Sequence, residues 1–461
     1  MGGGILRAKA TAVLLGPEGF GTVSAVLQIP QLLFVPLGLV TGPALVSSLG
    51  RARARQEAGQ LYNDTAATLV LFGGAVLGAL SVLTGVYVFR DQPPVLVLFT
   101  ALAAVGAMLD PLARIPNANL LARGEVRQYA VIMATTSVVV AVVASAATAL
   151  AGLWGQFIAA AVMPAVLLLL FSGLWRRALP DMRLVPRPAL DRDFLREAAA
   201  VGAATLVASI GLQGALSTIR WALWQQGGAE SNGQFQAAWS VGSAYLGIVM
   251  QGLGTGVFPR YAAATRESLP AEVDAAAKFV FDAAPPLILI AIAVREPMVH
   301  LLYSGEFDRA GTMLGYQMAA DLAKALSFVY AGVLLFRGEV RAYLVTEVLG
   351  ASLLGVSALV LVPLFGEIGA SYAYAITYSL YVVIAAVALS RACDVSVRWR
   401  PVVLALVFTA GATGAVEVTG HWPMLRWVLL GVGCLWAMRT GVAHLVWTRV
   451  WTKLSGSGPR R

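Results

Sequence analysis

The chain has 461 residues, of which 58% are hydrophobic and 12% charged, with a mean hydropathy of +0.76 and a formal net charge of +9. A soluble domain has about 45–50% apolar and about 25% charged residues, so the composition excludes a soluble protein and indicates a membrane protein. The positive charge does not indicate a nucleic-acid partner, because it is concentrated on one side of the predicted helices.

Apolar segments long enough to cross about 30 Å of hydrocarbon, roughly 20 residues each, recur along the whole chain. They predict an all-α polytopic membrane protein with about 13 to 14 transmembrane helices. The predicted spans are approximately 20–48, 66–89, 95–121, 129–151, 153–175, 199–223, 235–258, 280–303, 312–335, 342–364, 367–390, 401–418 and 425–447.

The first of these spans contains Pro30, Pro36 and Pro43, which predicts bends, because a proline inside a helix removes a backbone hydrogen bond. Ahead of it, Ile5 to Leu15 would cover only about 16 Å at 1.5 Å per residue. We therefore expect a truncated first helix, either because the true start lies upstream or because a helix was lost.

The connections between the spans differ strongly in charge. Alternate connections, together with the C-terminal tail, hold 23 Lys and Arg residues, whereas the connections on the opposite side hold 4. Basic residues resist translocation, so the basic side is predicted to be cytoplasmic. This places the protein in the cell (inner or plasma) membrane with a cytoplasmic C-terminus.

One loop sequence occurs twice in the chain. The segment "LLARGEVRQYAV" (120–131) returns 214 residues later as "LLFRGEVRAYLV" (334–345), which indicates an internal duplication. The same separation relates Gly19 to Gly233, Gly152 to Gly366 and Gly155 to Gly369. An even number of spans lies between the copies, so the repeats are parallel, as in carriers whose halves rock about a central site.

The repeat defines the predicted domains. We expect two six-helix lobes, an N-terminal lobe over 1–197 and a C-terminal lobe over 198–398. An additional transmembrane helix pair with a cytoplasmic tail follows over 399–461.

Ionisable residues inside membrane spans are costly and usually face a bundle interior or a water-filled cavity. Asp110, Arg114 and Asn117 lie at i, i+4 and i+7, on one face of their predicted helix. Asp321 and Lys324 lie in the equivalent helix of the second repeat, where Lys324 corresponds to Asp110. Two arrangements stay open: an interlobe contact between Asp110 and Lys324, or a local pair within each helix.

Arg220 and Glu347 complete the candidates for a substrate cavity. Arg220 has the alternative of reaching to the membrane interface, and Gln213 and Gln251 either bind sugar hydroxyls or join helices. The Arg and Lys residues among these candidates suit an anionic cargo such as a pyrophosphate, to which Arg offers bidentate donors.

Catalytic and metal-binding motifs are absent: the sequence has no HExxH, GxSxG, Walker-type GxxxxGK[ST] or paired CxxC motif. We therefore expect no enzymatic activity, no cofactor and no metal. What remains is transport driven by an H+ or Na+ gradient or by the gradient of the cargo itself.

Several stretches carry a resemblance to a known family. They are "LLGPEGFGTVSAV" (14–26), "GVFPRYAAATRE" (256–267), "LLYSGEFDRAGTML" (301–314) and "LVPLFGEIGASYAYAITY" (361–378). Together with the second "RGEVR" loop they resemble the Wzx-type oligosaccharide flippases, over most of residues 10–390. These belong to the polysaccharide branch of the MOP (multidrug/oligosaccharidyl-lipid/polysaccharide) exporter superfamily.

The resemblance implies alternating access between two lobes, and movement of a polyprenyl-pyrophosphate-linked oligosaccharide from the cytoplasmic to the outer leaflet for cell-surface polysaccharide biosynthesis. It implies the lipid bilayer and the lipid-linked saccharide as partners, and a polysaccharide polymerase or glycosyltransferases as further ones. By position, Arg114, Arg220 and Lys324 best match the basic cavity residues of the family. The added helix pair resembles the lipid II flippase branch, whose last two helices help to form a groove for the lipid tail.

Three alternatives stay open: a lipid II flippase of the same fold, a MATE-like ion-coupled drug antiporter, and a non-transporting scaffold for glycosyltransferases. An antiporter would favour buried carboxylates without a surplus of basic residues. A scaffold would tolerate changes at Asp110, Arg114 or Lys324.

Overall fold

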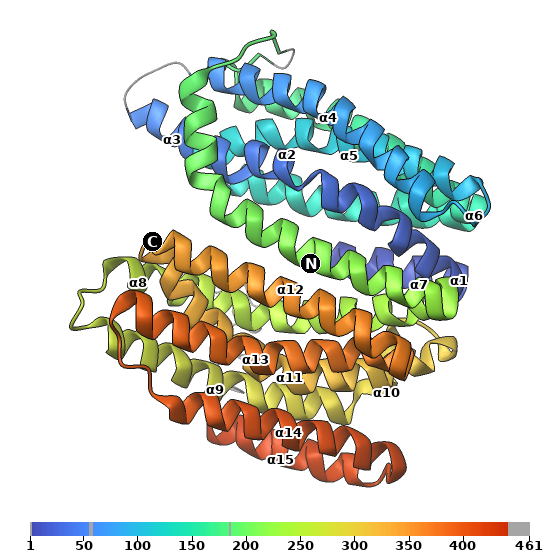
Figure 1. Cartoon of the computed structure of the whole chain (residues 1–461). Helices are drawn as coiled ribbons and strands as arrows, with labels where there is room; N and C mark the ends of the chain where they lie inside the picture. Colours follow the sequence, from blue (N-terminus) through green and yellow to red (C-terminus); the bar gives the residue numbers. More distant parts are fainter. Residues whose placement is uncertain (1, 55–58, 184–185, 441–461) are drawn as a thin grey trace. The chain divides into compact units, whose positions relative to one another are not determined.

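The structure is a computed structural model that describes residues 2–54, 59–183 and 186–440 (Figure 1). These residues form helices and connections without a strand, so the predicted all-α fold is confirmed. The helices are α1 (Gly2–Leu33), α2 (Val35–Leu39), η1 (Val40–Ala44), α3 (Leu45–Ala54), α4 (Gln60–Val88), α5 (Val95–Ala122), α6 (Val126–Ala178), α7 (Arg192–Gly256), α8 (Phe258–Ala263), α9 (Leu269–Ala293), α10 (Arg295–Leu302), η2 (Gly305–Phe307), α11 (Asp308–Phe336), α12 (Val340–Phe365), α13 (Ile368–Cys393), α14 (Trp399–His421) and α15 (Leu425–Arg439).

The chain forms two compact units, unit 1 (Met1–Gly233) and unit 2 (Gln234–Arg461). Helix α7 belongs to both, because its first part packs in unit 1 and its last part in unit 2. The lobe boundaries at 197 and 398 rest on the sequence repeat and stay predictions.

Ten helices of the described residues are long and apolar enough to cross a membrane. Two of them, α6 and the stretch Thr205–Gly247 within α7, are too long for one crossing and are interrupted at glycines. The last predicted span begins as expected at Leu425, and its end lies outside the described residues, as does the C-terminal tail.

A glycine in the left-handed region lies at the turn where α6 reverses direction and at the end of α12. Gly152 interrupts α6 with φ 56° and ψ −133°, and Gly366 ends α12 with φ 63°. Three residues later, a Cβ at Gly155 would lie 1.8 Å from the carbonyl oxygen of Ala147, so only glycine closes this hairpin. The spans predicted over 129–151 and 153–175 are therefore the two halves of α6.

The other left-handed glycines of the described residues also come in pairs. Gly124 and Gly338, with φ 76° and 80°, lie in the two "RGEVR" loops, and Gly16 and Gly228, both with φ 65°, break α1 and α7. The duplication is thus present in the backbone conformation as well as in the sequence.

The second half of α1 and the middle of α7 cross with direct backbone contact. A Cβ at Gly21 would lie 1.7 Å from the carbonyl oxygen of Ala229, and a Cβ at Gly233 would lie 1.9 Å from that of Pro17. The contact is reciprocal, so these two segments are equivalents. The sequence offset paired Gly233 with Gly19; the structure pairs it with Gly21, because the separation between the repeats is two residues shorter in this part.

Proline and glycine divide the first predicted span. Helix α1 ends before Phe34, and the chain continues through α2, the π-helical turn η1 and α3. The sharpest break is at Gly42, with φ −105° and ψ −107°, next to Pro43. The predicted bending is confirmed. The short segment ahead of Gly16, expected as a truncated first helix, is helical and is separated from the rest of α1 by that glycine.

Helix α9 differs from its predicted span, 280–303. It begins at Leu269, with Pro270 in its first turn, where a proline fits because its missing N–H has no helical partner. The carboxylates of its first turns pair with other segments, Glu272 with Arg260 and Asp274 with Arg398, so the helix carries its charges ahead of the apolar span. Hydropathy alone therefore placed the start too late.

In unit 1 the connection before α7 is tied to α4. Four backbone N–H groups donate to α4 side chains: Arg183 to Gln60 (3.0 Å), Arg187 to Asp64 (3.2 Å), Ala189 to Thr68 (3.0 Å) and Asp191 to Thr65 (3.1 Å). Asp191 also caps α7 by accepting the Phe194 N–H at 2.7 Å. Phe194 is fully buried in a core with Leu45 and Ile115, so the start of α7 is fixed to unit 1.

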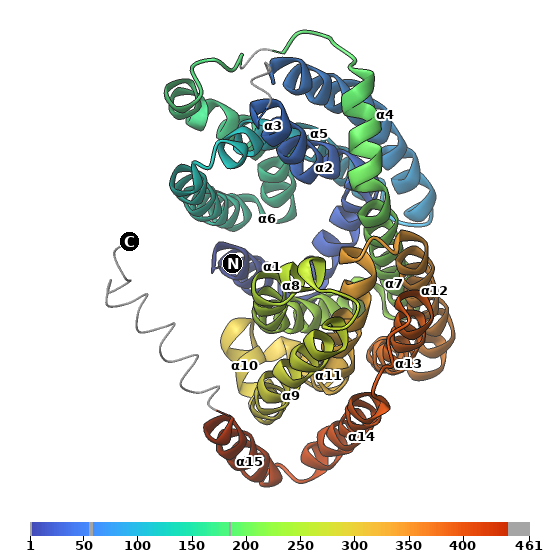
Figure 2. The ribbon, with the colours of Figure 1, turned by 90° about the vertical axis from the view of Figure 1, so that its left-hand side faces the viewer.

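Unit 2 is built around α11, which packs against α9, α12, α13 and α14 (Figure 2). In an apolar 18-residue stretch of α11, 78% of the residues are buried. The corresponding share is 39% in α5, the equivalent helix of unit 1. The terminal helices α14 and α15 lie at the edge of unit 2, against α11 and α9 respectively (Figure 1, Figure 2).

A polar clasp at one end holds this terminal pair in place. Arg295 of α10 is buried and donates to the Ile292 carbonyl oxygen at 3.1 Å and to the Thr419 hydroxyl of α14 at 2.9 Å. The neighbouring Glu296 pairs with Arg426 of α15. Because a buried guanidinium without partners is costly, these contacts fix both terminal helices to α10.

Candidate functional site

Unit 1 contains a cavity of about 860 Å³. Side chains of α1, α2, α5, α6 and the first part of α7 line it. Its volume falls within the range of about 300–1,000 Å³ that small-molecule sites occupy. The cavity is therefore large enough for a saccharide or phosphate headgroup.

Bent helices explain why this space is not filled. Pro30, Pro43, Pro111 and Pro164 all line the cavity, and each stands inside a helical segment, where it removes a backbone hydrogen bond and bends the helix. At its edge α5 and α6 approach so closely that a Cβ at Gly106 would lie 2.1 Å from a carbonyl oxygen of α6. The helices touch there and diverge around the cavity.

Asp110 and Arg114 of α5 form an ion pair on the cavity wall. The Arg114 Nε donates to Asp110 Oδ2 at 2.8 Å, and Arg114 Nη2 lies 2.6 Å from the same oxygen. Their side chains are 48% and 54% exposed, so both can reach a ligand. Gly38 faces the guanidinium, with its Cβ position 3.5 Å from Arg114 Nη1, and leaves room beside it.

The wall of the cavity is mixed in chemistry. Its charged members are Arg7, Asp110 and Arg114, so positive charges outnumber negative ones. Its amide side chains are Gln31, Gln156 and Gln213. Most other lining residues are apolar, among them leucines, valines, alanines and prolines. Such a wall suits an amphipathic ligand with an anionic group and hydroxyls.

Asn117 lies outside this wall, although it shares a helix face with Asp110 and Arg114. Its side chain is buried, and its Oδ1 has no hydrogen-bond partner among the described atoms. Seven residues separate Asn117 from Asp110, about 10 Å along the helix at 1.5 Å per residue. A shared helix face therefore does not place the three side chains at one site.

Arg220 of α7 is buried at the crossing with α1 instead of lining the cavity. Its Nε donates to Gln28 Oε1 at 3.2 Å and its Nη1 to Asn232 Oδ1 at 3.4 Å. Asn232 in turn donates to the Gly21 carbonyl oxygen at 2.9 Å. Arg220 therefore braces the close crossing of α1 and α7.

Asp321 and Lys324 of α11 are joined through a tyrosine in unit 2. Tyr374 Oη donates to Asp321 Oδ1 at 2.6 Å and accepts from Lys324 Nζ at 3.0 Å. Tyr245 of α7 donates to the second carboxylate oxygen, Asp321 Oδ2. The ammonium also faces aromatic rings, so the pair is enclosed by α7, α11 and α13.

Glu347 of α12 belongs to the same polar region. Tyr381 Oη donates to Glu347 Oε1 at 2.6 Å. On α13, the ring of Tyr378 lies between those of Tyr374 and Tyr381, with centroids 4.6 and 6.1 Å away. A row of tyrosines thus connects the surroundings of Asp321 with Glu347.

The chain is similar in sequence and in structure to known membrane transporters. No family model matches the chain. It is 24% identical over 413 residues to the lipid III flippase of Escherichia coli (strain K12), covering 87% of this chain and 95% of that protein. Its structure is similar to that of the lipid II flippase MurJ in an inward closed conformation, with a TM-score of 0.67 and 11% identity, over 98% of this chain and 97% of that one.

A second solved structure extends the comparison. A multidrug resistance MATE family transporter of the MOP superfamily, in an inward-facing conformation, gives a TM-score of 0.63 at 15% identity, over 90% of this chain and 95% of that one. The chain has the fold of the MOP-superfamily transporters. With its apolar helices, it is a multi-pass membrane protein.

Within this MOP fold the structure groups the predicted residues in three places. Asp110 and Arg114 lie together on the cavity wall, and Arg220 lies in the α1–α7 crossing. Asp321, Lys324 and Glu347 lie along the tyrosines of α13. Asp110 pairs with Arg114 within unit 1, and Asp321 and Glu347 accept hydrogen bonds from tyrosines of unit 2. The interlobe contact between Asp110 and Lys324 stays a prediction.

Sequence reasoning missed the tyrosines and much of the cavity wall. Tyr374, Tyr378 and Tyr381 recur at i, i+4 and i+7, a spacing that signals one helix face. Arg7 lies in the segment predicted as a truncated first helix, so the sequence does not predict that it lines the cavity. Gln213, weighed as a ligand for sugar hydroxyls or a link between helices, lines the cavity, and its carbonyl oxygen accepts a hydrogen bond from Gln28.

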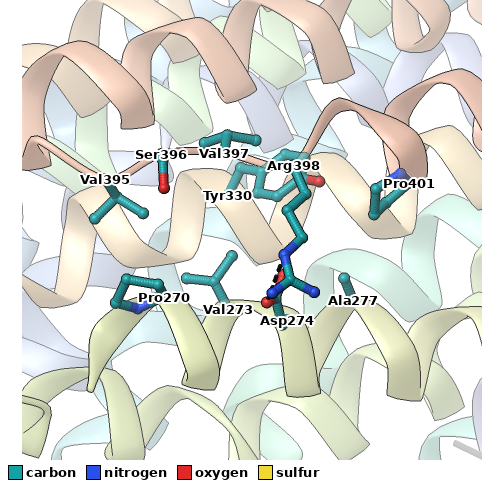
Figure 3. Close-up of a pocket in the computed structure, with 10 residues that line it drawn as sticks. All are labelled: Pro270, Val273, Asp274, Ala277, Tyr330, Val395, Ser396, Val397, Arg398 and Pro401. Atoms are coloured by element: carbon teal, nitrogen blue, oxygen red, sulfur yellow. Dashed lines mark ion pairs between the residues drawn. The ribbon is translucent and has the colours of Figure 1, made fainter. Parts of the chain in front are cut away.

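A further pocket of unit 2 is too small to be a substrate site. It lies where residues 395–398 pass over α9, and Arg398 pairs there with Asp274 at 3.3 Å (Figure 3). Its volume of about 10 Å³ is at the lower limit for one water molecule. Tyr330 is among the residues that line this pocket.

Proposed function

We propose that the chain is a flippase that moves a polyprenyl-pyrophosphate-linked oligosaccharide from the cytoplasmic to the outer leaflet of the cell (inner) membrane. The observation that carries this proposal is the cavity of unit 1, which combines Arg7 and Arg114 with three amides and an apolar wall. An anionic headgroup with hydroxyls matches the polar part, and a prenyl chain matches the apolar part.

The similarity to the lipid III flippase of Escherichia coli supports the same kind of activity, because that protein is named for flipping a lipid. In this proposal Arg114 and Arg7 contact the pyrophosphate, while Asp110 positions Arg114 through their shared hydrogen bond. Gln31, Gln156 and Gln213 contact sugar hydroxyls. The protein acts as a transporter without catalysing a reaction, and alternating access with H+ or Na+ coupling moves the cargo.

Two predictions made from the sequence are part of this proposal. The C-terminus is cytoplasmic, on the side with the surplus of Lys and Arg. A polysaccharide polymerase or glycosyltransferases act next to the transporter, because they would make its cargo or consume it.

A lipid II flippase is the second candidate. The terminal helices α14 and α15 favour it, since the MurJ structure corresponds to 98% of this chain. The cavity chemistry fits both cargoes, which share a pyrophosphate, so the headgroup must be identified by experiment.

The deciding experiment depletes the protein in its native host and measures polyprenyl-linked saccharides by mass spectrometry. A membrane-impermeant probe reports which leaflet exposes them. We expect a complete oligosaccharide to accumulate on the inner leaflet, and its mass separates the two cargoes. Re-expression of the wild type or of R90Q should clear the pool, whereas R114Q should not, because Arg90 pairs with Asp91 outside the cavity. An unchanged pool contradicts the proposal, and sensitivity to cationic drugs would then favour an antiporter.

A further inference from the structure

The ammonium of Lys324 lies inside a box of aromatic rings in unit 2. Its Nζ is 5.3 Å from the centroid of Trp239, 5.0 Å from that of Tyr374 and 4.9 Å from that of Tyr378. Trp239 comes from α7 and the two tyrosines from α13, and the rings of Trp239 and Tyr374 meet edge to face with centroids 6.0 Å apart. All three distances are within the range of about 6 Å in which a ring face attracts a cation.

The rest of the box is built to balance a positive charge. Asp321 is 1% exposed, and both of its oxygens accept hydrogen bonds from tyrosines, Tyr245 and Tyr374. The carboxylate is therefore held in place beside the rings, independently of Lys324. Aromatic rings with a fixed carboxylate are the features by which proteins recognise organic ammonium ions.

We propose that unit 2 contains an organic-cation site that the chain fills with its own Lys324 ammonium. The tethered ammonium makes the site permanently occupied, so Lys324 determines specificity by excluding external cations. This inference concerns unit 2 alone and goes beyond the proposed flippase activity, because it assigns a ligand class to a site away from the cavity of unit 1.

The geometry leaves a way into the box once the tether is removed. Lys324, Trp239 and Tyr245 are partly exposed, whereas Asp321 and Tyr374 are buried. The box is therefore closed at the carboxylate and open at the lysine. Truncation to alanine removes the atoms from Cγ to Nζ, and n-propylammonium consists of the same chain of atoms.

The test uses the full chain purified in detergent, as wild type and as K324A, with thermal unfolding in increasing n-propylammonium chloride. Sodium chloride at equal ionic strength is the reference. We expect n-propylammonium to raise the Tm of K324A by about 2–4 °C at saturation and to leave the wild type unchanged, because a ligand stabilises only a protein with a vacant site. Isothermal titration should show one site per chain in K324A alone.

Two further variants control for this result. K278A removes an exposed lysine of α9 that pairs with Asp282, and it should show no response to n-propylammonium. In the double variant D321N/K324A the response should disappear, because the carboxylate that balances the ligand is gone. Equal stabilisation of K324A by n-propanol, or no stabilisation at all, would overturn the proposal.

K324M keeps the inference testable where K324A fails to fold. Methionine fills the space without a charge, so K324M should be less stable than the wild type, and D321N should restore stability in its background. A K324M chain as stable as the wild type would show that the box does not need an ammonium and would overturn the inference.

Discussion

The two units share a repeated sequence, yet equivalent helices serve opposite purposes in them. In unit 1, α5 contains Pro111 and Pro116, and its Asp110–Arg114 pair is half exposed on a cavity wall. In unit 2, α11 contains no proline, and Asp321 is enclosed by tyrosines. One copy of the helix keeps its charges available to a ligand, and the other uses them within the protein.

The terminal helices contribute to this difference. Helix α14 packs along α11, and a Cβ at Gly315 would lie 3.0 Å from both Arg295 and Val416. Helix α14 thus covers a helix whose equivalent in unit 1 has only half as large a buried share. The two repeats therefore share their turns, where glycine is required, and differ in the interiors of their helices.

The largest expected effect separates the two carboxylates. Asp321→Ala leaves the hydroxyls of Tyr245 and Tyr374 without their acceptor and the nearby Lys324 ammonium without a balancing charge, so we expect the free energy of unfolding to fall by about 3–5 kcal/mol. Asp110→Ala removes a half-exposed pair and should cost about 0–1 kcal/mol. Unfolding of the detergent-solubilised full chain measures both. Equal losses would contradict the contrast between the units.

Next in size is the effect of the cavity arginine on transport. Arg114→Gln removes a charge-assisted contact of about 1.5–3 kcal/mol to the anionic cargo, which corresponds to a loss of roughly 10- to 100-fold in apparent affinity. Flipping of lipid-linked oligosaccharide in proteoliposomes measures it, with Arg90→Gln as the matched control. Full activity of the Arg114 variant would remove this residue from the site.

A third prediction concerns what the units have in common. Gly155→Ala and Gly369→Ala each place a Cβ within about 2 Å of a carbonyl oxygen, 1.8 Å and 2.1 Å respectively, so both should lower the free energy of unfolding by about 1–3 kcal/mol. Gly78→Ala in α4 meets open space and should stabilise by about 0.5–1 kcal/mol. Thermal unfolding compares the three. If only one hairpin variant is destabilised, the hairpins are not equivalent.

The smallest effect distinguishes the connections that precede α7 and α14. Thr65→Val leaves the Asp191 N–H of unit 1 without its acceptor and should cost about 1 kcal/mol. Arg398→Gln breaks an ion pair of unit 2 whose arginine is 76% exposed, and it should cost less, about 0–1 kcal/mol. Unfolding in denaturant resolves the difference. A larger loss in the Arg398 variant would reverse the order.

Much of the fold could be predicted from the chain alone, because its signals are local. Apolar runs indicated the spans, and the repeated glycines indicated the turns, including the hairpin at Gly152. Hydropathy failed at α9, where the helix begins at Leu269 and its first turns carry charges that pair with other segments. The offset failed by two residues at Gly233, because an offset counts positions without reporting which backbones touch.

The candidate site was predicted less completely, for a physical reason. Charge inside a span signals function, but whether it meets a ligand depends on neighbours distant in the sequence. Gln28 and Arg220 are 192 residues apart, and their hydrogen bond makes Arg220 a brace. Asp321 and Tyr374 are 53 residues apart, and their contact makes Asp321 part of a closed box.

The sequence by itself determined the class of protein, the duplication and the charged candidate residues inside the spans. Composition, glycine conformation and charge are properties of single residues and short segments. Only the tertiary structure decided that Asp110 and Arg114 lie half exposed on a cavity wall, while Asp321 lies buried among tyrosines. Burial and hydrogen bonding arise when distant helices pack, and the cover that α14 provides over α11 emerges only in the folded chain.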